Sequence, residues 1–155
     1  MLEIRLLDGR IILIFLNCSP IIWYSKAQNT VETSTFGSEF TALQIAVEML
    51  ESLRYKLHMF GIPLEGPANV FCDNSSVVTN ASQPASTLKK KHNSIAYHKV
   101  REAIAAQTIR IAWVQTNQNL ADVLTKPLVG SKLHGLCEKI IYFYKPDQSE
   151  TLQAN

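Results

Sequence analysis

The sequence predicts an α/β fold, and three observations support this prediction. Short apolar runs bounded by turn residues fill the first 25 residues and indicate a meander of two or three antiparallel strands. From Ser38 onward, apolar residues recur every three or four positions, which is typical of a long helix. The apolar run at residues 70–72 stops at Asp73, in front of helix-capping residues, and this indicates a buried strand followed by a helix.

Length and composition bound the class of protein. A chain of 155 residues with 46% apolar content is expected to form one domain with an ordinary core. Cys18, Cys72 and Cys137 are an odd number of cysteines in no recognised metal pattern, so we expect free thiols and an intracellular, reducing location. The longest N-terminal apolar run, at residues 11–16, is too short for a membrane helix and follows acidic residues, so neither a membrane span nor secretion is expected.

Alternation and turn signals define the N-terminal strands. Residues 2–6 alternate between apolar and polar side chains, and Asp8-Gly9 is a tight-turn signal directly before the second apolar run. A third strand is expected at residues 21–25, after the break at Pro20. The polar stretch at residues 28–35 then indicates a loop.

The long helix carries the first candidate site residue, Glu39. Its apolar stripe runs to residue 60, where Gly61 and Pro63 end it. Glu39 is expected in the first turn, bordering this stripe, and two interpretations stay open. The carboxylate either complements the positive end of the helix or points toward the end of the sheet beside Asp73.

Asp73 also has two interpretations. The carboxyl ends of strands in open α/β sheets are where ligands bind, so a carboxylate there can hold a metal ion. Alternatively, Asp73 caps the helix that begins near Ser75. The sequence alone does not decide between a metal ligand and a helix cap.

The second half continues with alternating elements. They are a loop at residues 83–87, a basic segment at 89–101 that becomes a helix ending near 106, a strand at 108–114, a short helix at 120–126 with Asp122 in its first turn, and a final helix at 132–143. The basic segment is either a solvated face or a surface that follows phosphates. We assign residues 1–144 to one domain and expect the polar tail at 145–155 to be frayed.

Four motifs together carry a resemblance to a known family. They are Ser38-Glu39-Phe40, Phe71-Cys72-Asp73-Asn74, the group Lys91-His92, Tyr97-His98 and Arg101, and the run Leu-Ala-Asp-Val-Leu-Thr-Lys-Pro at residues 120–127. In this order and spacing, over residues 11–136, the chain resembles the ribonuclease H domain of copia-type retrotransposon Pol polyproteins, truncated at its N-terminus. The resemblance implies a ribonuclease H-like mixed sheet, in which three antiparallel strands are followed by parallel strands and helices cover both faces.

The resemblance also implies an activity and a site. Family members cut the RNA strand of an RNA–DNA hybrid with two Mg²⁺ ions, or Mn²⁺ in their place, and use no small-molecule cofactor. Carried over, the metal ligands are Glu39, Asp73 and Asp122, and the carboxylates of Glu39 and Asp73 should lie within about 10 Å if they share ions about 4 Å apart. The residues expected to contact nucleic acid are Asn74, Lys89, Lys90, Lys91, His92, His98 and Arg101. Reverse transcriptase is expected upstream in the same polyprotein.

One departure from the family concerns its first metal-binding Asp. In the family this Asp lies on an opening strand upstream of the segment that matches residues 11–16, where this chain has only residues 1–10. Either residues 2–6 replace that strand and Asp8 approximates the missing ligand, or the site has only three carboxylates. We favour the second alternative because Asp8-Gly9 is more simply a hairpin turn. A site that lacks one carboxylate should bind metal poorly, so we expect weak or absent activity.

Three functions therefore compete. The first is a ribonuclease H-like nuclease that is impaired in this copy. The second is a noncatalytic remnant or gene fragment that still binds RNA–DNA hybrids. The third, an integrase-like nuclease of the same superfamily, is disfavoured because its Glu comes last, on a late helix, whereas Glu39 comes first.

Overall fold

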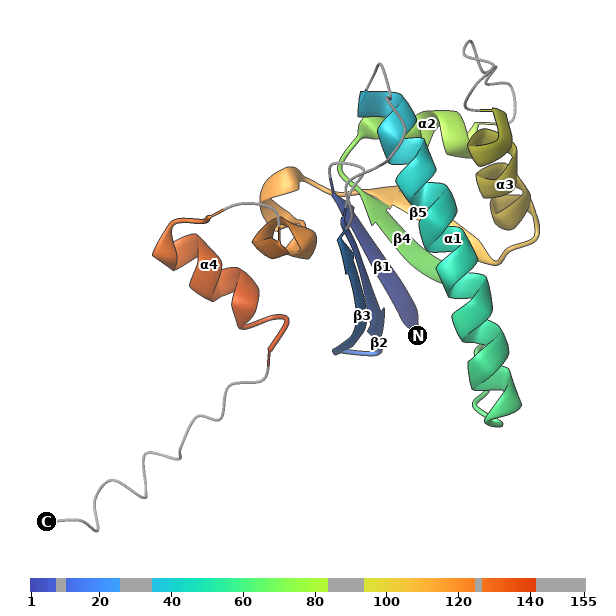
Figure 1. Ribbon diagram of the computed structural model, residues 1–155, viewed down its shortest axis with the longest axis horizontal. Coiled ribbons are helices and arrows are strands. Elements are labelled where there is room, and N and C mark those ends of the chain that lie inside the picture. The colour runs from blue at the N-terminus through green and yellow to red at the C-terminus, as the bar shows by residue number, and fades with distance from the viewer. Residues whose placement is uncertain (8–10, 26–34, 84–93, 125–126, 142–155) are drawn as a thin grey trace, which may run out of the picture.

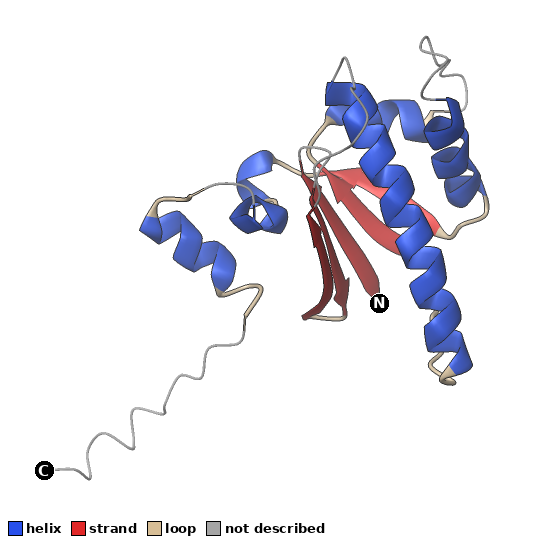
Figure 2. Cartoon of the chain, in the orientation of Figure 1, coloured by secondary structure: helices blue, strands red, loops and turns tan. Residues whose placement is uncertain are grey.

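A mixed five-stranded sheet forms the centre of the computed structural model, which describes residues 1–7, 11–25, 35–83, 94–124 and 127–141. The strands are β1 (Leu2–Leu7), β2 (Ile11–Leu16), β3 (Ser19–Ser25), β4 (Ala68–Cys72) and β5 (Ile109–Trp113), in the spatial order β3-β2-β1-β4-β5. The helical elements are α1 (Thr35–Met59), α2 (Ser75–Ser82), α3 (Ser94–Ala105), the 3₁₀ turns η2 (Thr116–Gln118) and η3 (Leu120–Leu124), and α4 (Gly130–Cys137). Figure 2 shows the helices around this sheet, and the predicted mixed α/β fold is confirmed.

Strand β1 occupies the middle of the sheet. It runs antiparallel to β2, with Leu7 opposite Ile11, and parallel to β4, with Leu6 opposite Cys72. Strands β2 and β3 are antiparallel, and β4 and β5 are parallel, as expected. Residues 2–7 therefore do supply a first strand, although we did not favour the alternative in which residues 2–6 replace it. That alternative also uses Asp8 as a metal ligand. Asp8 lies outside the described residues, together with the predicted Asp8-Gly9 turn.

The two faces of the sheet bury different clusters. On one face, Ile12 and Ile14 of β2 join the main core, which α1, α2 and α3 cover. On the other face, Leu13 and Phe15 pack with Leu120 of η3 and Leu136 of α4. This division follows from the period of two in a strand, because neighbouring side chains point to opposite faces. Figure 1 shows α1–α3 on one side of the sheet and η3 with α4 on the other.

Helix α1 begins at Thr35, earlier than the predicted start near Ser38. Phe36 extends the apolar stripe by one turn, since its ring lies 4.9 Å from that of Phe40. The first turn of α1 contains no acidic residue, so the prediction that Glu39 lies there was wrong. The predicted face is confirmed, because Leu43, Ala46 and Leu50 are each 0% exposed.

The later elements also differ from the predicted bounds. Residues 120–124 form a 3₁₀ turn because Asp122 N donates to Asn119 O, three residues back, and the Asn119 side chain accepts from Ala121 N. Helix α4 starts at Gly130, before the predicted start, and ends at Cys137. The basic residues 89–92, the tail at 145–155 and the end of the predicted last helix lie outside the described residues. No helix in the described ranges is long and apolar enough to cross a membrane.

Candidate metal site at the carboxyl end of β4

Three potential ligands meet where β4 ends. Oxygen atoms of Glu39 and Asp73 and the sulfur of Cys72 all lie within 4.8 Å of one another. Glu39 comes from α1, Cys72 is the last residue of β4, and Asp73 follows it. The distance between the two carboxylates is well inside the limit of about 10 Å that a shared pair of ions requires. The expected proximity of Glu39 and Asp73 is therefore confirmed, while their role as metal ligands stays a prediction.

The simpler explanations for these two carboxylates placed each of them at a helix N-terminus. Asn74, and not Asp73, caps α2, because its side-chain oxygen accepts from Ser76 N at 2.9 Å and from Val77 N at 3.3 Å. Glu39 lies beyond the first turn of α1, where the field of the helix end has weakened. Both acids therefore lie at the end of the sheet, where Asp73 is not the N-cap of α2 and Glu39 is not in the first turn of α1.

Cys72 is the member of this group that the sequence did not indicate. Its thiol is 2% exposed and donates to Glu39 Oε2 at 3.7 Å. Burial raises the pKa of Cys72 from its ordinary value of 9.0 to about 12, and the charges of Glu39 and Asp73 add to this increase. Cys72 is therefore a neutral donor that orients Glu39. The sequence feature that could have indicated Cys72 is the alternation of side chains along β4. This alternation places Cys72 on the same face as Val70, toward α1.

The raised pKa of Cys72 predicts an alkaline loss of stability. Above pH 9 the unfolded chain releases the thiol proton while the folded chain keeps it, so stability falls with rising pH until the folded pKa of about 12. Between pH 9 and 10.5 we expect the unfolding free energy to fall by up to about 1.4 kcal/mol per pH unit more in the native chain than in Cys72→Ala. Urea titrations at several pH values, with EDTA present, measure this difference. Parallel pH profiles for the two proteins would contradict the buried, protonated thiol.

Asp122 is not a member of the group formed by Glu39, Cys72 and Asp73. Its side chain is 0% exposed, and its Oδ2 atom lies 2.7 Å from Lys132 Nζ of α4. The turn η3 that carries it is attached to the carboxyl end of β1, because Asn119 Nδ2 donates to Leu6 O at 2.6 Å. Asp122 therefore belongs to the same end of the sheet but has a lysine as its counter-ion.

Strand β1 presents apolar side chains to α1. Leu2, Ile4 and Leu6 belong to the main core. The one carboxylate within β1, Glu3, lies on the opposite face of the sheet, where it forms an ion pair of 2.6 Å with Arg5. Arg5 in turn lies 4.0 Å above the ring of Phe71. Within residues 2–7, β1 thus adds no carboxylate to the group around Asp73.

The chemistry of the donor set suits a hard divalent cation. Oxygen ligands of a single Mg²⁺ lie about 2.0–2.1 Å from the ion, and so at most about 4.2 Å from each other. The oxygens of Glu39 and Asp73 lie within 4.8 Å of each other, which is close to this spacing. The Thr116 hydroxyl, 3.3 Å from Asp73 Oδ2, is placed to hold that carboxylate. Glu39 and Asp73 therefore fit a cation, with neutral donors beside them.

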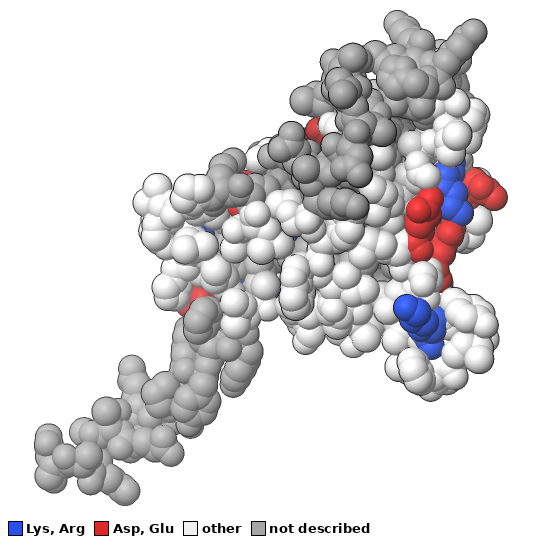
Figure 3. Space-filling model, in the orientation of Figure 1, with Lys and Arg blue, Asp and Glu red and all other residues white. Residues whose placement is uncertain are grey.

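The described part of the basic segment is largely engaged in intramolecular contacts. Arg101 donates to Gln83 O at 2.9 Å and to the Tyr97 hydroxyl at 2.6 Å. Lys99 pairs with Glu51 of α1 at 2.9 Å, and this hydrogen bond raises the pKa of Lys99. Figure 3 shows acidic and basic atoms mixed over this side of the molecule. His98 is exposed at the start of α3, and the nucleic-acid contacts expected for His98 and Arg101 stay predictions.

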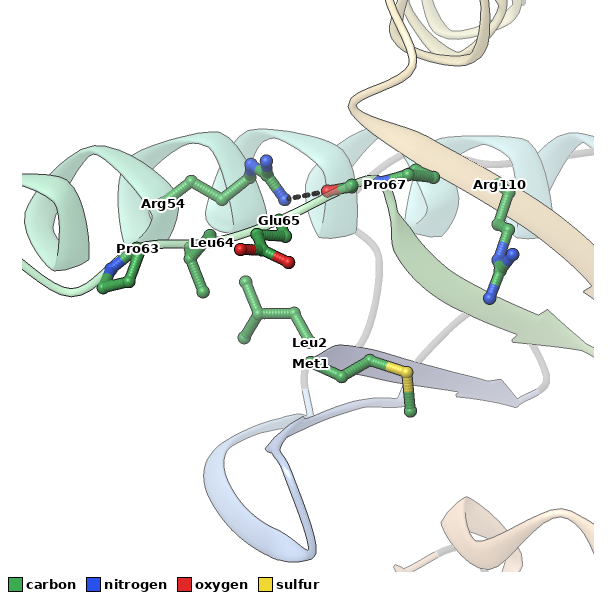
Figure 4. Close-up of a pocket in the computed structure, with 9 residues that line it drawn as sticks. Met1, Leu2, Arg54, Pro63, Leu64, Glu65, Pro67 and Arg110 are labelled. Atoms are coloured by element: carbon green, nitrogen blue, oxygen red, sulfur yellow. Dashed lines mark hydrogen bonds between the residues drawn. The ribbon is translucent and has the colours of Figure 1, made fainter.

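A pocket of about 460 Å³ lies at the other end of the sheet (Figure 4). It is bordered by Leu2 at the start of β1 and by the loop that leads into β4, with Arg54 and Arg110 on its sides. Arg54 donates to Gly66 O at 3.1 Å, which closes this loop onto α1. Because the carboxylates gather at the carboxyl ends of β1 and β4, this pocket is separate from the candidate metal site.

The strand order and the position of the acids define the class of the domain. The sheet has three antiparallel strands and is extended by the parallel strands β4 and β5. Helices lie on both of its faces, and acidic residues lie at the carboxyl end of β4. This arrangement is consistent with a ribonuclease H-like fold.

The chain is similar in sequence to retrovirus-related Pol polyproteins from transposons. The retrovirus-related Pol polyproteins from transposons RE1 and RE2 of Arabidopsis thaliana are each 30% identical to it over 128 residues, which is 83% of this chain. The retrovirus-related Pol polyprotein from transposon TNT 1-94 of Nicotiana tabacum is 30% identical over 122 residues, or 78% of this chain. The chain spans only 9% of the length of each relative. No family model matches the sequence. The homologues of this chain are thus Pol polyproteins, and it corresponds to a small region of them.

Proposed function

We propose that this chain is the ribonuclease H-like nuclease domain of a retrotransposon Pol polyprotein, which hydrolyses the RNA strand of RNA–DNA hybrids with two Mg²⁺ ions. The observation that carries the proposal is the meeting of Glu39 and Asp73 within 4.8 Å at the carboxyl end of β4. Similarity to Pol polyproteins over 83% of the chain supports it. In this proposal the chain works inside the cell, with reverse transcriptase upstream as its partner.

Each residue of the site has a defined role in this proposal. The metal ions, when bound, supply an activated water and stabilise the departing 3′ oxygen. Glu39 and Asp73 hold them, while Cys72 and Thr116 fix the orientation of these two carboxylates. Because the side-chain oxygen of Asn74 caps α2, its amide nitrogen is the group that donates to the nucleic-acid backbone.

The proposal includes an impaired activity. The side chains of β1 that face α1 are apolar, so the first strand lacks the acid that the family uses there. Asp122 is the third ligand of this proposal, and in the structure its carboxylate is paired with Lys132. Asp8, which directly follows β1 in the sequence, is the fourth carboxylate that this proposal considers.

Mn²⁺ binding tests this site directly. Glu39→Gln and Asp73→Asn should each weaken Mn²⁺ affinity by about tenfold or more, because affinity follows the number and charge of the oxygen ligands. Calorimetric titration of the full chain measures the effect. Glu48→Gln is the matched control, since Glu48 lies on α1 too but is exposed and bonded to Gln44. Equal affinity in all four proteins would refute the metal site.

The alternative is a noncatalytic module that binds RNA–DNA hybrids through the basic segment. Replacing Lys89, Lys90 and Lys91 by Ala should weaken hybrid binding and reduce the slope of log affinity against log salt by roughly 0.9 for each phosphate that is no longer neutralised, as for B-form DNA. Fluorescence anisotropy at several salt concentrations measures the slope. Lys99→Ala is the control, because Lys99 is already paired with Glu51. An unchanged slope would mean that the three lysines are only a solvated face.

A further inference from the structure

The ion pair between Asp122 and Lys132 is the feature that the proposed mechanism does not use. Asp122 is completely buried, whereas the Lys132 side chain is 39% exposed. A buried carboxylate needs a partner, and the ammonium group 2.7 Å from Oδ2 supplies a full positive charge. The exposure of Lys132 also gives its side chain a path into solvent, so it can leave Asp122 without unfolding the domain.

The Asp122–Lys132 pair is positioned at the end of the sheet that carries the candidate metal site. Asn119, three residues before Asp122, bonds to Leu6 O, and Leu6 lies opposite Cys72 in the sheet. Thr116, which donates to Asp73, belongs to the segment that leads into η3. One short stretch of chain therefore connects Asp73 with Asp122.

We propose that the Lys132 ammonium takes the place of a divalent cation at Asp122 and competes with it. The chain then binds one ion readily, through Glu39 and Asp73, and binds a second at Asp122 only when Lys132 withdraws. This inference rests on the proposed function, because it assumes that Glu39 and Asp73 hold the first ion. Lys132 acts here as a positioning residue, since it works through Asp122.

The experiment counts bound Mn²⁺ in the full chain by the electron paramagnetic resonance signal of the free ion. The native chain should bind one Mn²⁺, and Lys132→Gln should bind a second with at least about tenfold higher affinity than the native chain, because Asp122 regains its charge as a ligand. Lys132→Arg keeps the positive charge and should behave like the native chain. The double variant Lys132→Gln/Asp122→Asn has neither charge and should again bind one ion.

The outcomes separate this inference from the proposed function. One Mn²⁺ in both the native chain and Lys132→Gln, or two in the native chain, overturns the role of Lys132 but leaves the first site intact. If none of the proteins binds Mn²⁺, the metal site at Glu39 and Asp73 is refuted, and so is the competition between Lys132 and a second ion. If Lys132→Gln is unfolded without metal, circular dichroism replaces the count: Mn²⁺ should restore its fold at concentrations where Na⁺ does not. Failure of Mn²⁺ to do so also overturns the inference.

Discussion

The native chain should cleave an RNA–DNA hybrid very slowly or not at all in Mg²⁺. An extended chain, in which a longer first strand that carries an Asp replaces residues 1–10 upstream of Ile11, should recover cleavage. Each tenfold change in rate corresponds to about 1.4 kcal/mol of transition-state stabilisation, and loss of one metal ligand can cost several such steps. We therefore expect the extended chain to be at least about a hundredfold faster than the native chain.

The reason lies in the balance of charge at the site. Two divalent ions carry four positive charges, whereas Glu39, Asp73 and Asp122 offer at most three negative ones. Lys132 already offsets the charge of Asp122. The inward side chains of β1 are apolar, so nothing on that strand compensates. A site with this deficit should hold one ion better than two, and two-ion hydrolysis needs both.

A gel assay of a labelled hybrid with four proteins measures this prediction. They are the native chain, Asp8→Asn, the extended chain, and the extended chain with Glu39→Gln, which is the control for metal-dependent cleavage. Robust cleavage by the native chain that disappears in Asp8→Asn would overturn the prediction and make Asp8 the fourth ligand. Cleavage that survives Glu39→Gln would instead indicate a contaminating nuclease.

Local pattern was sufficient to predict most of the fold. The continuous apolar run of β2 and the 3.6-residue period of α1 reflect which side chains are buried, so both elements and the inward face of α1 followed from the sequence. The end of β4 just before Asp73 followed from the change to capping residues. The start of α1 did not, because Phe36 extends the stripe by a contact within the helix, in a region whose preceding residues suggested a loop.

The candidate site was predictable only in part, because its remaining members depend on contacts distant in sequence. Cys72 acts through Glu39, 33 residues away, and only the folded packing of α1 on β4 makes the two meet. In the sequence, Lys132 is an ordinary lysine of the final predicted helix. Only the structure shows that the turn η3 places Asp122 beside it. Asn74, and not Asp73, caps α2. The two candidates are neighbours in the sequence, and capping preferences do not define a helix start to within one residue.

The position of β1 leads to the largest expected effect on stability. Ile4 is 0% exposed and lies between Ile14 of β2 and Val70 of β4. Because both neighbours are well packed and cannot collapse into the space, Ile4→Ala should lower the unfolding free energy by about 2–5 kcal/mol. Urea unfolding followed by circular dichroism measures this change.

The matched control for Ile4 is Ile21→Ala on the edge strand β3, where the side chain is already 38% exposed. Its removal leaves little cavity, so we expect a loss of only about 1 kcal/mol or less. Comparable small losses at both positions would mean that residues 2–7 do not form the central strand in solution. In that case the sheet would lack the strand that joins β2 to β4, and the fold would have no first strand beside Asp73 on which a metal ligand could be restored. A large loss at Ile4 alone would instead identify residues 2–7 as a true replacement strand, one that completes the sheet without completing the acidic site.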